Sequence, residues 1–302
     1  MLFNSKEFIL FLPFVIIVYY LIPHRFRWAM LLIVSYYFYM CWKAEYIILI
    51  LISTIIDYIS AILISKQPEK KKKQNYLMVS IFLNLGFLFT FKYLNFVTAS
   101  INDVLSYFKA TGEIPYSQIL LPVGISFYTF QSLSYTIDVY NNKIKPEKHF
   151  GIFALYVSYW PQLVAGPIER ASTLLPQFSE KKTFNYDNFV WGLNKIALGF
   201  FKKLVVADRL APYVENVFGV FFSQSDSLSL LIAVFFFSIQ IYCDFSGYSD
   251  IAIGSAKLMG YDLMENFKRP YLSKSISEKI PMKKGQVSRP KGIPVLCSID
   301  DW

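Results

Sequence analysis

The chain of 302 residues is rich in apolar side chains, with 55% hydrophobic, 19% aromatic and only 17% charged residues. Soluble domains carry about 25% charged residues, so the composition excludes an ordinary soluble protein and predicts one integral membrane domain of hydrophobic helices. The net charge of +9 lies in short clusters beside apolar runs, which favours membrane lipid over nucleic acid as the partner of these charges. Cys41, Cys243 and Cys297 have no metal-ligand spacing, so we expect no disulfide framework and no metal site.

Four apolar stretches, each bounded by charge, occupy the first hundred residues: 8–22, 28–42, 46–65 and 76–91. Each is close to the length of about 20 residues that a spanning helix needs. The loop 66–75 holds five lysines, four of them at 70–73. The positive-inside rule places this loop in the cytoplasm together with Arg25 and Arg27, so the N-terminus is predicted to lie outside.

Glycine and proline interrupt the apolar pattern at 120–124 and 164–168. Such breaks predict kinked or re-entrant helices that line a cavity, because freed backbone groups at membrane depth need polar partners. Further apolar segments at 125–139, 150–164 and 228–243 bring the expected total to about eight spans or half-spans.

Residues 188–204 have a helical amphipathic pattern. Phe189, Ile196 and Phe200 lie on its apolar face, and Lys195 and Lys202 lie opposite. We expect this helix to lie in the cytoplasmic interface with its lysines toward lipid phosphates.

Aspartates within or beside apolar stretches are the main candidates for function, because charges are costly in lipid. Asp57 and Asp138 are expected to be capped, paired or near a membrane face. Asp244 and Asp250 bracket the polar segment 245–249, which predicts a polar pocket or a backbone bend.

The two histidines, His24 and His149, are predicted to be loop residues without a catalytic role. The chain also lacks a GxSxG elbow, a P-loop and an HExxH motif. These residues alone indicate a polytopic membrane protein with an internal polar pocket.

Five motifs then occur in order: LPVGISFYTFQ at 121–131, YWPQLVAGPI at 159–168, GFFKK at 199–203 with ADR at 207–209, QIYCDFSGYSD at 240–250, and NFKRPY at 266–271. Together they resemble the membrane-bound O-acyltransferase family, in the branch of the bacterial alginate O-acetyltransferases. The resemblance extends from residue 1 to about residue 278.

This resemblance implies an all-α transmembrane bundle around a tunnel in the cell membrane. A cytoplasmic thioester donor, acetyl-CoA or an acyl-carrier intermediate, would supply the acyl group without any bound cofactor. The acceptor would be a hydroxyl of an exported or cell-wall polysaccharide, and a protein outside the cytoplasm that handles acyl groups would be the partner. A histidine deep in the tunnel is the general base of the family. Matching positions here supply tunnel or packing residues, namely Gln131, Gln162, Asp244, Ser246, Tyr248 and Asp250, and residues that shape the backbone, namely Gly166, Pro167 and Gly247.

The chain departs from the family pattern after Glu278. Residues 279–302 contain three prolines and no apolar span, so we expect a second, poorly ordered segment. The family histidines do not occur, so no catalytic residue is assigned, and the chain by itself is expected to be inactive as a truncated form.

Three alternatives stay open: transfer of D-alanine to teichoic acid, a transporter, and a non-catalytic scaffold that docks an acyl-handling protein. A transporter would require broken helices in two related halves, and no such halves are visible.

Overall fold

A computed structural model of the chain describes residues 1, 3–108, 114–116, 122–163, 166–220, 226–265 and 271. The chain divides into two units, Met1–Met264 and Glu265–Trp302. Only Glu265 and Tyr271 of the second unit are described, so the predicted segment 279–302 and most of the motif 266–271 lie outside the described residues. The first unit is built from helices, and no strand occurs in its described part.

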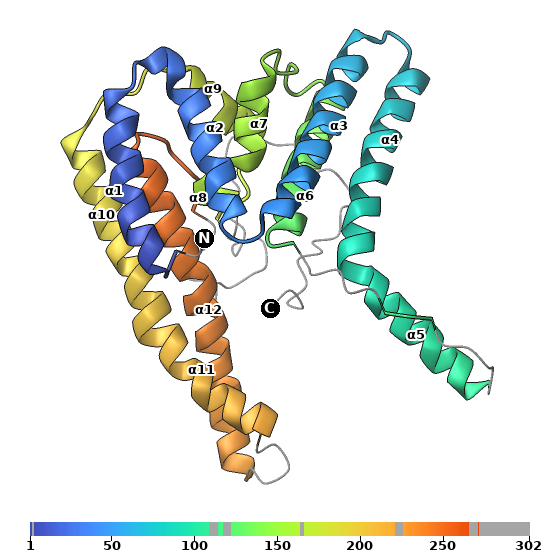
Figure 1. Cartoon of the computed structure of the whole chain (residues 1–302), viewed down its shortest axis with the longest axis vertical. Helices are drawn as coiled ribbons and strands as arrows, with labels where there is room; N and C mark the ends of the chain where they lie inside the picture. Colours follow the sequence, from blue (N-terminus) through green and yellow to red (C-terminus); the bar gives the residue numbers. More distant parts are fainter. Residues whose placement is uncertain are drawn as a thin grey trace. The chain divides into compact units, whose positions relative to one another are not determined.

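The N-terminal helices agree with the four predicted apolar stretches and extend several of them (Figure 1). They are α1 (Lys6–Leu21), α2 (His24–Met40), α3 (Ile47–Lys66, after the short turn η1, Ala44–Tyr46) and α4 (Lys70–Leu88). The π-helical turn η2 (Phe89–Tyr93) joins α4 to α5 (Leu94–Tyr107). One detail of the prediction is wrong: the lysines at 70–73 form the first turn of α4 instead of a loop.

The middle of the unit contains α6 (Ile125–Tyr140), α7 (Phe150–Ser158), α8 (Trp160–Leu163) and α9 (Ala171–Ser179). The predicted apolar segment 150–164 is divided in the structure, because α7 ends at Ser158 and α8 covers only one turn, so the chain breaks earlier than the predicted interruption at 164–168. Gly124, with φ of 76°, precedes α6, and a glycine is suited to that position because a left-handed backbone is strained for other residues.

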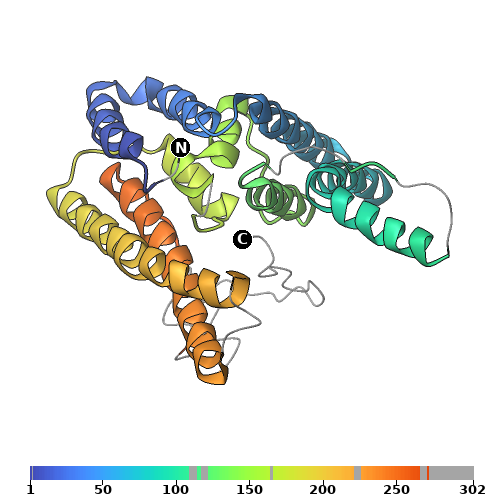
Figure 2. The same ribbon diagram turned by 60° about the horizontal axis from the view of Figure 1, so that its bottom comes forward.

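The last part of the unit is a long antiparallel helix pair, visible in both views (Figures 1 and 2). One member runs from α10 (Tyr186–Phe200) through the π-helical η3 (Phe201–Ala207) and α11 (Asp208–Glu215) to the π-helical η4 (Asn216–Val220). The other member is α12 (Ser227–Leu258), a continuous helix of 32 residues. The predicted backbone bend between Asp244 and Asp250 is therefore wrong.

Three helical segments of the described chain are long and apolar enough to cross a membrane: Ala44–Lys66, Lys70–Tyr107 and Ser227–Leu258. The prediction of about eight spans or half-spans exceeds this number. The difference arises because α1, α2 and α6 have only 16, 17 and 16 residues, although they pack beside the longer helices.

Polar side chains of these helices point inward, and many large apolar ones point outward. Phe82 of α4 and Leu231 of α12 are 78% and 68% exposed, whereas Asp57 of α3 and Asn84 of α4 are buried. Water would disfavour such a surface, but the hydrocarbon of a bilayer does not. The arrangement is that of a membrane protein.

Trp160 lies at the centre of the aromatic core. The rings of Phe3, Phe8, Phe11 and Phe38 lie around its indole, with centroid distances between 5.3 and 6.3 Å. The backbone N–H of Trp160 donates to the hydroxyl of Ser35 in α2 at 3.1 Å. The motif at 159–163 is therefore anchored against α1 and α2.

The α1–α2 and α3–α4 turns lie at one end of the unit, the upper end in Figure 1, and Arg25, Arg27, Lys66 and the lysines at 70–73 lie in or beside these turns along the chain. The connection before α7 lies there too, because Tyr58 of α3 donates to the carbonyl of Lys148. Arg27 donates to the carbonyl of Lys182 at 2.6 Å, which brings the α9–α10 connection to the same end.

Candidate functional site

Asp250, on the buried side of α12, is held by two lysines of the neighbouring helix. Its carboxylate oxygens lie 3.0 Å from Nζ of Lys195 and 2.5 Å from Nζ of Lys202. The side chain of Asp250 is 9% exposed, and those of the lysines are 19% and 21% exposed. Desolvated charges need such partners, so this triad fixes the register of the two helices.

Asp244 lies nearly two turns earlier on α12 and pairs with Lys203 at 2.5 Å. Lys203 also contacts Asp208 at 2.9 Å. Lys202 and Lys203 are adjacent in sequence, yet both reach α12, since the π-helical turn η3 widens the helix at this point. The three lysines and three aspartates form a neutral group, which we name the lysine–aspartate cluster.

These contacts correct the prediction for residues 188–204. The helix is amphipathic, but its lysines face α12 instead of lipid phosphates. Its apolar side chains divide between two directions: Ile196 is 6% exposed and belongs to the core, whereas Phe201 is 53% exposed. The polar face of α10 and η3 is occupied by α12, a helix of membrane length. The segment 188–204 is therefore half of a helix pair and not a separate interfacial helix.

Gly247 belongs to this helix pair. A Cβ atom there would lie 2.9 Å from the carbonyl oxygen of Gly199, and one on Gly199 would lie 2.6 Å from that of Gly247. Gly192 of α10 and Gly254 of α12 make the same kind of close contact at another point along the two helices. Gly247 was predicted to shape the backbone. In the structure it lies inside the regular helix α12, and its lack of a side chain allows α10 to pack closely against α12.

The other predicted residues of this motif lie beside the cluster. The ring of Tyr248 lies 5.3 Å from Nζ of Lys203 and 5.7 Å from the ring of Phe3. Ser246 is 3% exposed, and its hydroxyl has no hydrogen-bond partner among the described residues. The motif at 240–250 thus faces the core with a hydroxyl that could contact a ligand.

The structure brings Gln131 of α6 and Gln162 of α8 to a single backbone carbonyl. Their Nε2 atoms donate to the oxygen of Tyr156 at 2.8 and 2.9 Å. The hydroxyl of Tyr156 donates in turn to the carbonyl of Glu169 at 3.2 Å. Oε1 of Gln162 is buried without a partner among the described residues. The two glutamines therefore hold α7 and α8 against α6.

Gly166 and Pro167 follow α8 and are both buried. A Cβ atom on Gly166 would lie 2.3 Å from Cα of Gln162, which only a glycine avoids. This is the tight turn that the motif predicted for Gly166, although residues 164 and 165 lie outside the described part.

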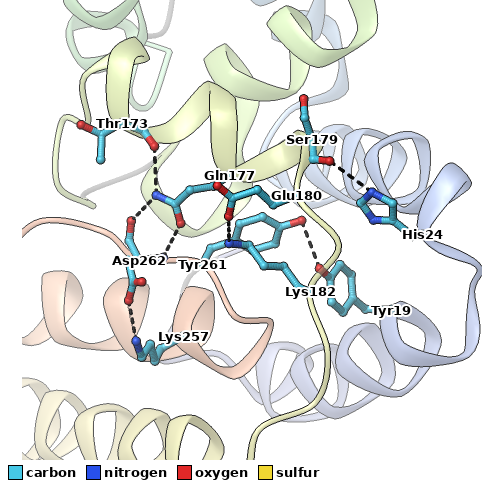
Figure 3. Close-up of polar contacts among 10 residues, drawn as sticks. All are labelled: Tyr19, His24, Thr173, Gln177, Ser179, Glu180, Lys182, Lys257, Tyr261 and Asp262. Atoms are coloured by element: carbon cyan, nitrogen blue, oxygen red, sulfur yellow. Dashed lines mark hydrogen bonds and ion pairs between the residues drawn. The ribbon is translucent and has the colours of Figure 1, made fainter.

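Sequence reasoning missed a polar network that joins the end of α12 to α9 (Figure 3). The side-chain amide of Gln177 donates to the carbonyl of Asp262 at 3.0 Å and accepts from its N–H at 2.8 Å. Tyr19 donates to the hydroxyl of Tyr261 at 3.1 Å. Burial and the neighbouring hydroxyls of Tyr19 and Tyr159 raise the pKa of Tyr261, so it stays neutral. No short motif marks these residues, because the contacts join distant segments.

The remaining candidates lie outside the lysine–aspartate cluster. Asp138 pairs with Lys143 at 3.4 Å, which is one of the three environments expected for it. His24 is the first residue of α2, not a loop residue, and its Nε2 lies 3.3 Å from the carbonyl oxygen of Ser179. His149 caps α7 by accepting from the N–H of Ile152 at 3.2 Å. Both histidines therefore have structural contacts at helix starts.

The described residues do not form a complete catalytic group. They contain no set of three or more His, Cys, Asp or Glu side chains that could hold a metal ion. The lysine–aspartate cluster and the glutamine pair can orient helices and offer polar contacts, but neither brings a histidine near a hydroxyl. Within the described residues, neither group therefore contains a histidine that could act as a general base.

Comparison with known proteins gives consistent matches. The sequence model described as "MBOAT, membrane-bound O-acyltransferase family" matches residues 148–280. The chain is 38% identical over 282 residues to the probable alginate O-acetylase AlgI of Azotobacter vinelandii. This alignment covers 92% of this chain and 55% of that protein. It is 32% identical to the peptidoglycan O-acetyltransferase of Helicobacter pylori, over 92% of this chain and 58% of that protein.

A weaker match joins the chain to the teichoic acid D-alanyltransferase of Bacillus subtilis, with 24% identity over 52% of this chain and 40% of that protein. The chain spans about half the length of the curated relatives it matches.

Proposed function

We propose that the chain is a member of the membrane-bound O-acyltransferase family and that it serves in the O-acetylation of an exported or cell-wall polysaccharide. The observation that supports this proposal most is the 38% identity with an alginate O-acetylase over 92% of the chain. The inward-facing polar groups of the helix pair fit a membrane enzyme that handles a polar substrate.

In the proposed reaction, a hydroxyl oxygen of the polysaccharide attacks the carbonyl carbon of a thioester. A C–O ester bond forms, the C–S bond breaks, and the hydroxyl proton ends on the thiol that leaves. Acetyl-CoA or an acyl-carrier thioester is the donor. A general base must take the proton during attack, and the two histidines of the chain occupy helix starts, so we assign no base here.

The gathering of basic residues supports an orientation for this reaction. The turns with Arg25 and Arg27, the start of α4 and Lys182 share one end of the unit. By the positive-inside rule this end is cytoplasmic, the N-terminus lies outside, and several helices cross the membrane. The donor would then enter at the basic end, and the acceptor and an acyl-handling partner protein would meet the opposite end.

Transfer of D-alanine to teichoic acid is the second candidate. The match to a teichoic acid D-alanyltransferase favours it, but this match covers only 52% of the chain. The higher identity and wider coverage of the acetylases favour acetyl transfer. A docking scaffold without its own chemistry is the third reading.

Deletion of the gene, followed by alkaline release of esters, tests the proposal. Ester-linked acetate on the exported or cell-wall polysaccharide should fall to background and return with an extended, in-frame form of the gene. Loss of D-alanine esters instead would support the second candidate, and unchanged levels of both would refute a role in acyl transfer.

Residues 1–302 expressed by themselves in a strain that lacks such an acetylase, with donor and partner proteins supplied, should give no ester-linked acetate. Loss of a general base alone costs about 10²- to 10⁴-fold in rate. Acetate above the level of an empty vector would show that residues 1–302 suffice and contain a general base that is not assigned here.

A further inference from the structure

A second polar group lies far along the chain from the residues of the lysine–aspartate cluster, and the proposed function does not use it. Asp57 lies within α3, its carboxylate facing α4 and α6. We name the following residues, all at most 2% exposed, the Asp57 cluster: Ser53, Asp57, Ser80, Asn84, Ser132 and Thr136. The sequence predicts Asp57 to be capped, paired or near a membrane face, and the structure pairs it by hydrogen bonds with Ser80 and Asn84 in the interior of a three-helix contact.

One oxygen of the Asp57 carboxylate is fully occupied. Oδ1 accepts from the hydroxyl of Ser80 and from Nδ2 of Asn84 at 2.9 Å. The hydroxyl of Ser53 donates to Oδ1 of Asn84 at 2.5 Å, which fixes the amide with its nitrogen toward Asp57. Donors from α4 therefore stabilise Oδ1 and lock its position.

The other oxygen has a different environment. Oδ2 is buried and accepts no hydrogen bond among the described residues. The hydroxyls of Ser132 and Thr136 lie beside the carboxylate, but they donate to the carbonyls of Thr129 at 3.1 Å and of Ser132 at 3.3 Å within α6. Each hydroxyl has a single proton, so while these bonds within α6 are made both hydroxyls have only lone pairs to offer a further ligand.

The charge of the cluster is also uncompensated. No lysine, arginine or histidine within the described residues forms an ion pair with Asp57, in contrast to Asp250 and Asp244. Both α3 and α4 belong to segments of membrane length, where an isolated negative charge is strongly disfavoured. The Oδ2 side of the Asp57 carboxylate carries a negative charge and offers only oxygen lone pairs, so it is suited to bind a cation.

We propose that the Asp57 cluster binds a sodium ion between α3, α4 and α6. Oδ2 of Asp57 and the hydroxyl oxygens of Ser132 and Thr136 would be its ligands, since hard cations prefer oxygen. A single carboxylate balances a single positive charge, and no group of three acidic, histidine or cysteine side chains exists among the described residues to favour a divalent ion. The bound ion would link α6 to the α3–α4 pair.

The test measures the thermal stability of the full chain in detergent, with sodium chloride replaced by choline chloride at constant ionic strength. A ligand that binds only the folded state raises the Tm with the logarithm of its concentration. We expect such a rise with sodium, together with retention of ²²Na⁺ by the purified protein. The ²²Na⁺ measurement requires no variant.

Three variants locate the site. Asp57→Asn keeps an acceptor oxygen for Ser80 and Asn84 and removes the charge, so the protein should fold and lose both the sodium-dependent rise and ²²Na⁺ retention. Thr136→Val keeps the shape and removes one ligand, which should weaken sodium binding about tenfold, a factor that corresponds to about 1.4 kcal/mol. Asp138→Asn, which removes the aspartate paired with Lys143, is the matched control and should respond as the original chain does.

Each outcome decides the proposal. Sodium dependence that disappears in Asp57→Asn and persists in Asp138→Asn supports it. A chain that retains no ²²Na⁺ and shows equal Tm values in sodium and choline would overturn it and indicate a proton on the carboxyl group instead. Sodium dependence that is the same in Asp57→Asn would also overturn it, because the ion would then bind elsewhere.

Discussion

Replacing Gly199 by alanine should separate the helix pair that carries the lysine–aspartate cluster. The new Cβ would lie 2.6 Å from the carbonyl oxygen of Gly247 and 2.7 and 2.9 Å from Cγ1 and N of Ile251. Two of these three atoms belong to the backbone of α12, so no side-chain rotation relieves the contact. The helices would have to move apart by roughly half an ångström or more to reach ordinary contact distances.

The expected magnitude follows from two opposing effects. Overpacking a closely packed contact costs about 1–3 kcal/mol, and the rigid backbone partner places this site at the upper end. Alanine gains up to about 1 kcal/mol over glycine inside a helix. The net loss of stability for Gly199→Ala is therefore about 2 kcal/mol.

Gly86→Ala in α4 is the matched control, because no heavy atom lies within 4 Å of a Cβ there. It retains the gain from helix propensity and lacks the overpacking, so the two variants should differ by about 3 kcal/mol. This difference corresponds to roughly 6–12 °C in Tm, measured by thermal unfolding in detergent. Equal Tm values for the two variants would refute the close approach of α10 and α12.

Three further predictions concern charge and placement. Asp250→Ala leaves Lys195 and Lys202 without their carboxylate and should lower the free energy of unfolding by about 3–5 kcal/mol. Lys195→Met should lower it less, because Lys202 still pairs with Asp250. Equal losses of stability for the two variants in thermal unfolding would contradict the triad. Phe201→Asp should lower stability or membrane insertion by about 3 kcal/mol if this face meets lipid, with Phe201→Leu nearly neutral; a normal yield of Phe201→Asp would place the face in water. Lys71→Cys, in a chain without its native cysteines, should resist an impermeant thiol reagent in intact cells, and ready labelling would reverse the orientation.

The sequence determined that the chain is a helical membrane protein and where most helices lie. Apolar stretches of nearly spanning length, interrupted by charge, leave few other folds. The turn at Gly166 could also be predicted, since glycine and proline act through local backbone geometry, whereas the break after Ser158 was not predicted. Of the polar residues that the motifs singled out, Gln131, Gln162 and Asp250 are buried and Asp244 is half-buried.

Only the tertiary structure decided which residues meet. The amphipathic pattern of 188–204 fits an interfacial helix as well as one paired with another helix, because periodicity reports a polar face and not its partner. Asp250 on α12 decides between the two arrangements, because it forms ion pairs with Lys195 and Lys202 on the polar face of this helix.

Asp57 shows the same limit. Its sequence neighbours are consistent with a position near a membrane face, yet its partners Ser80 and Asn84 lie on another helix and are brought to it by packing. Periodicity and composition are properties of neighbours along the chain, whereas the energy of a buried charge depends on the groups that surround it in space. For this reason the sequence could identify the charged residues, and the fold had to show what compensates them.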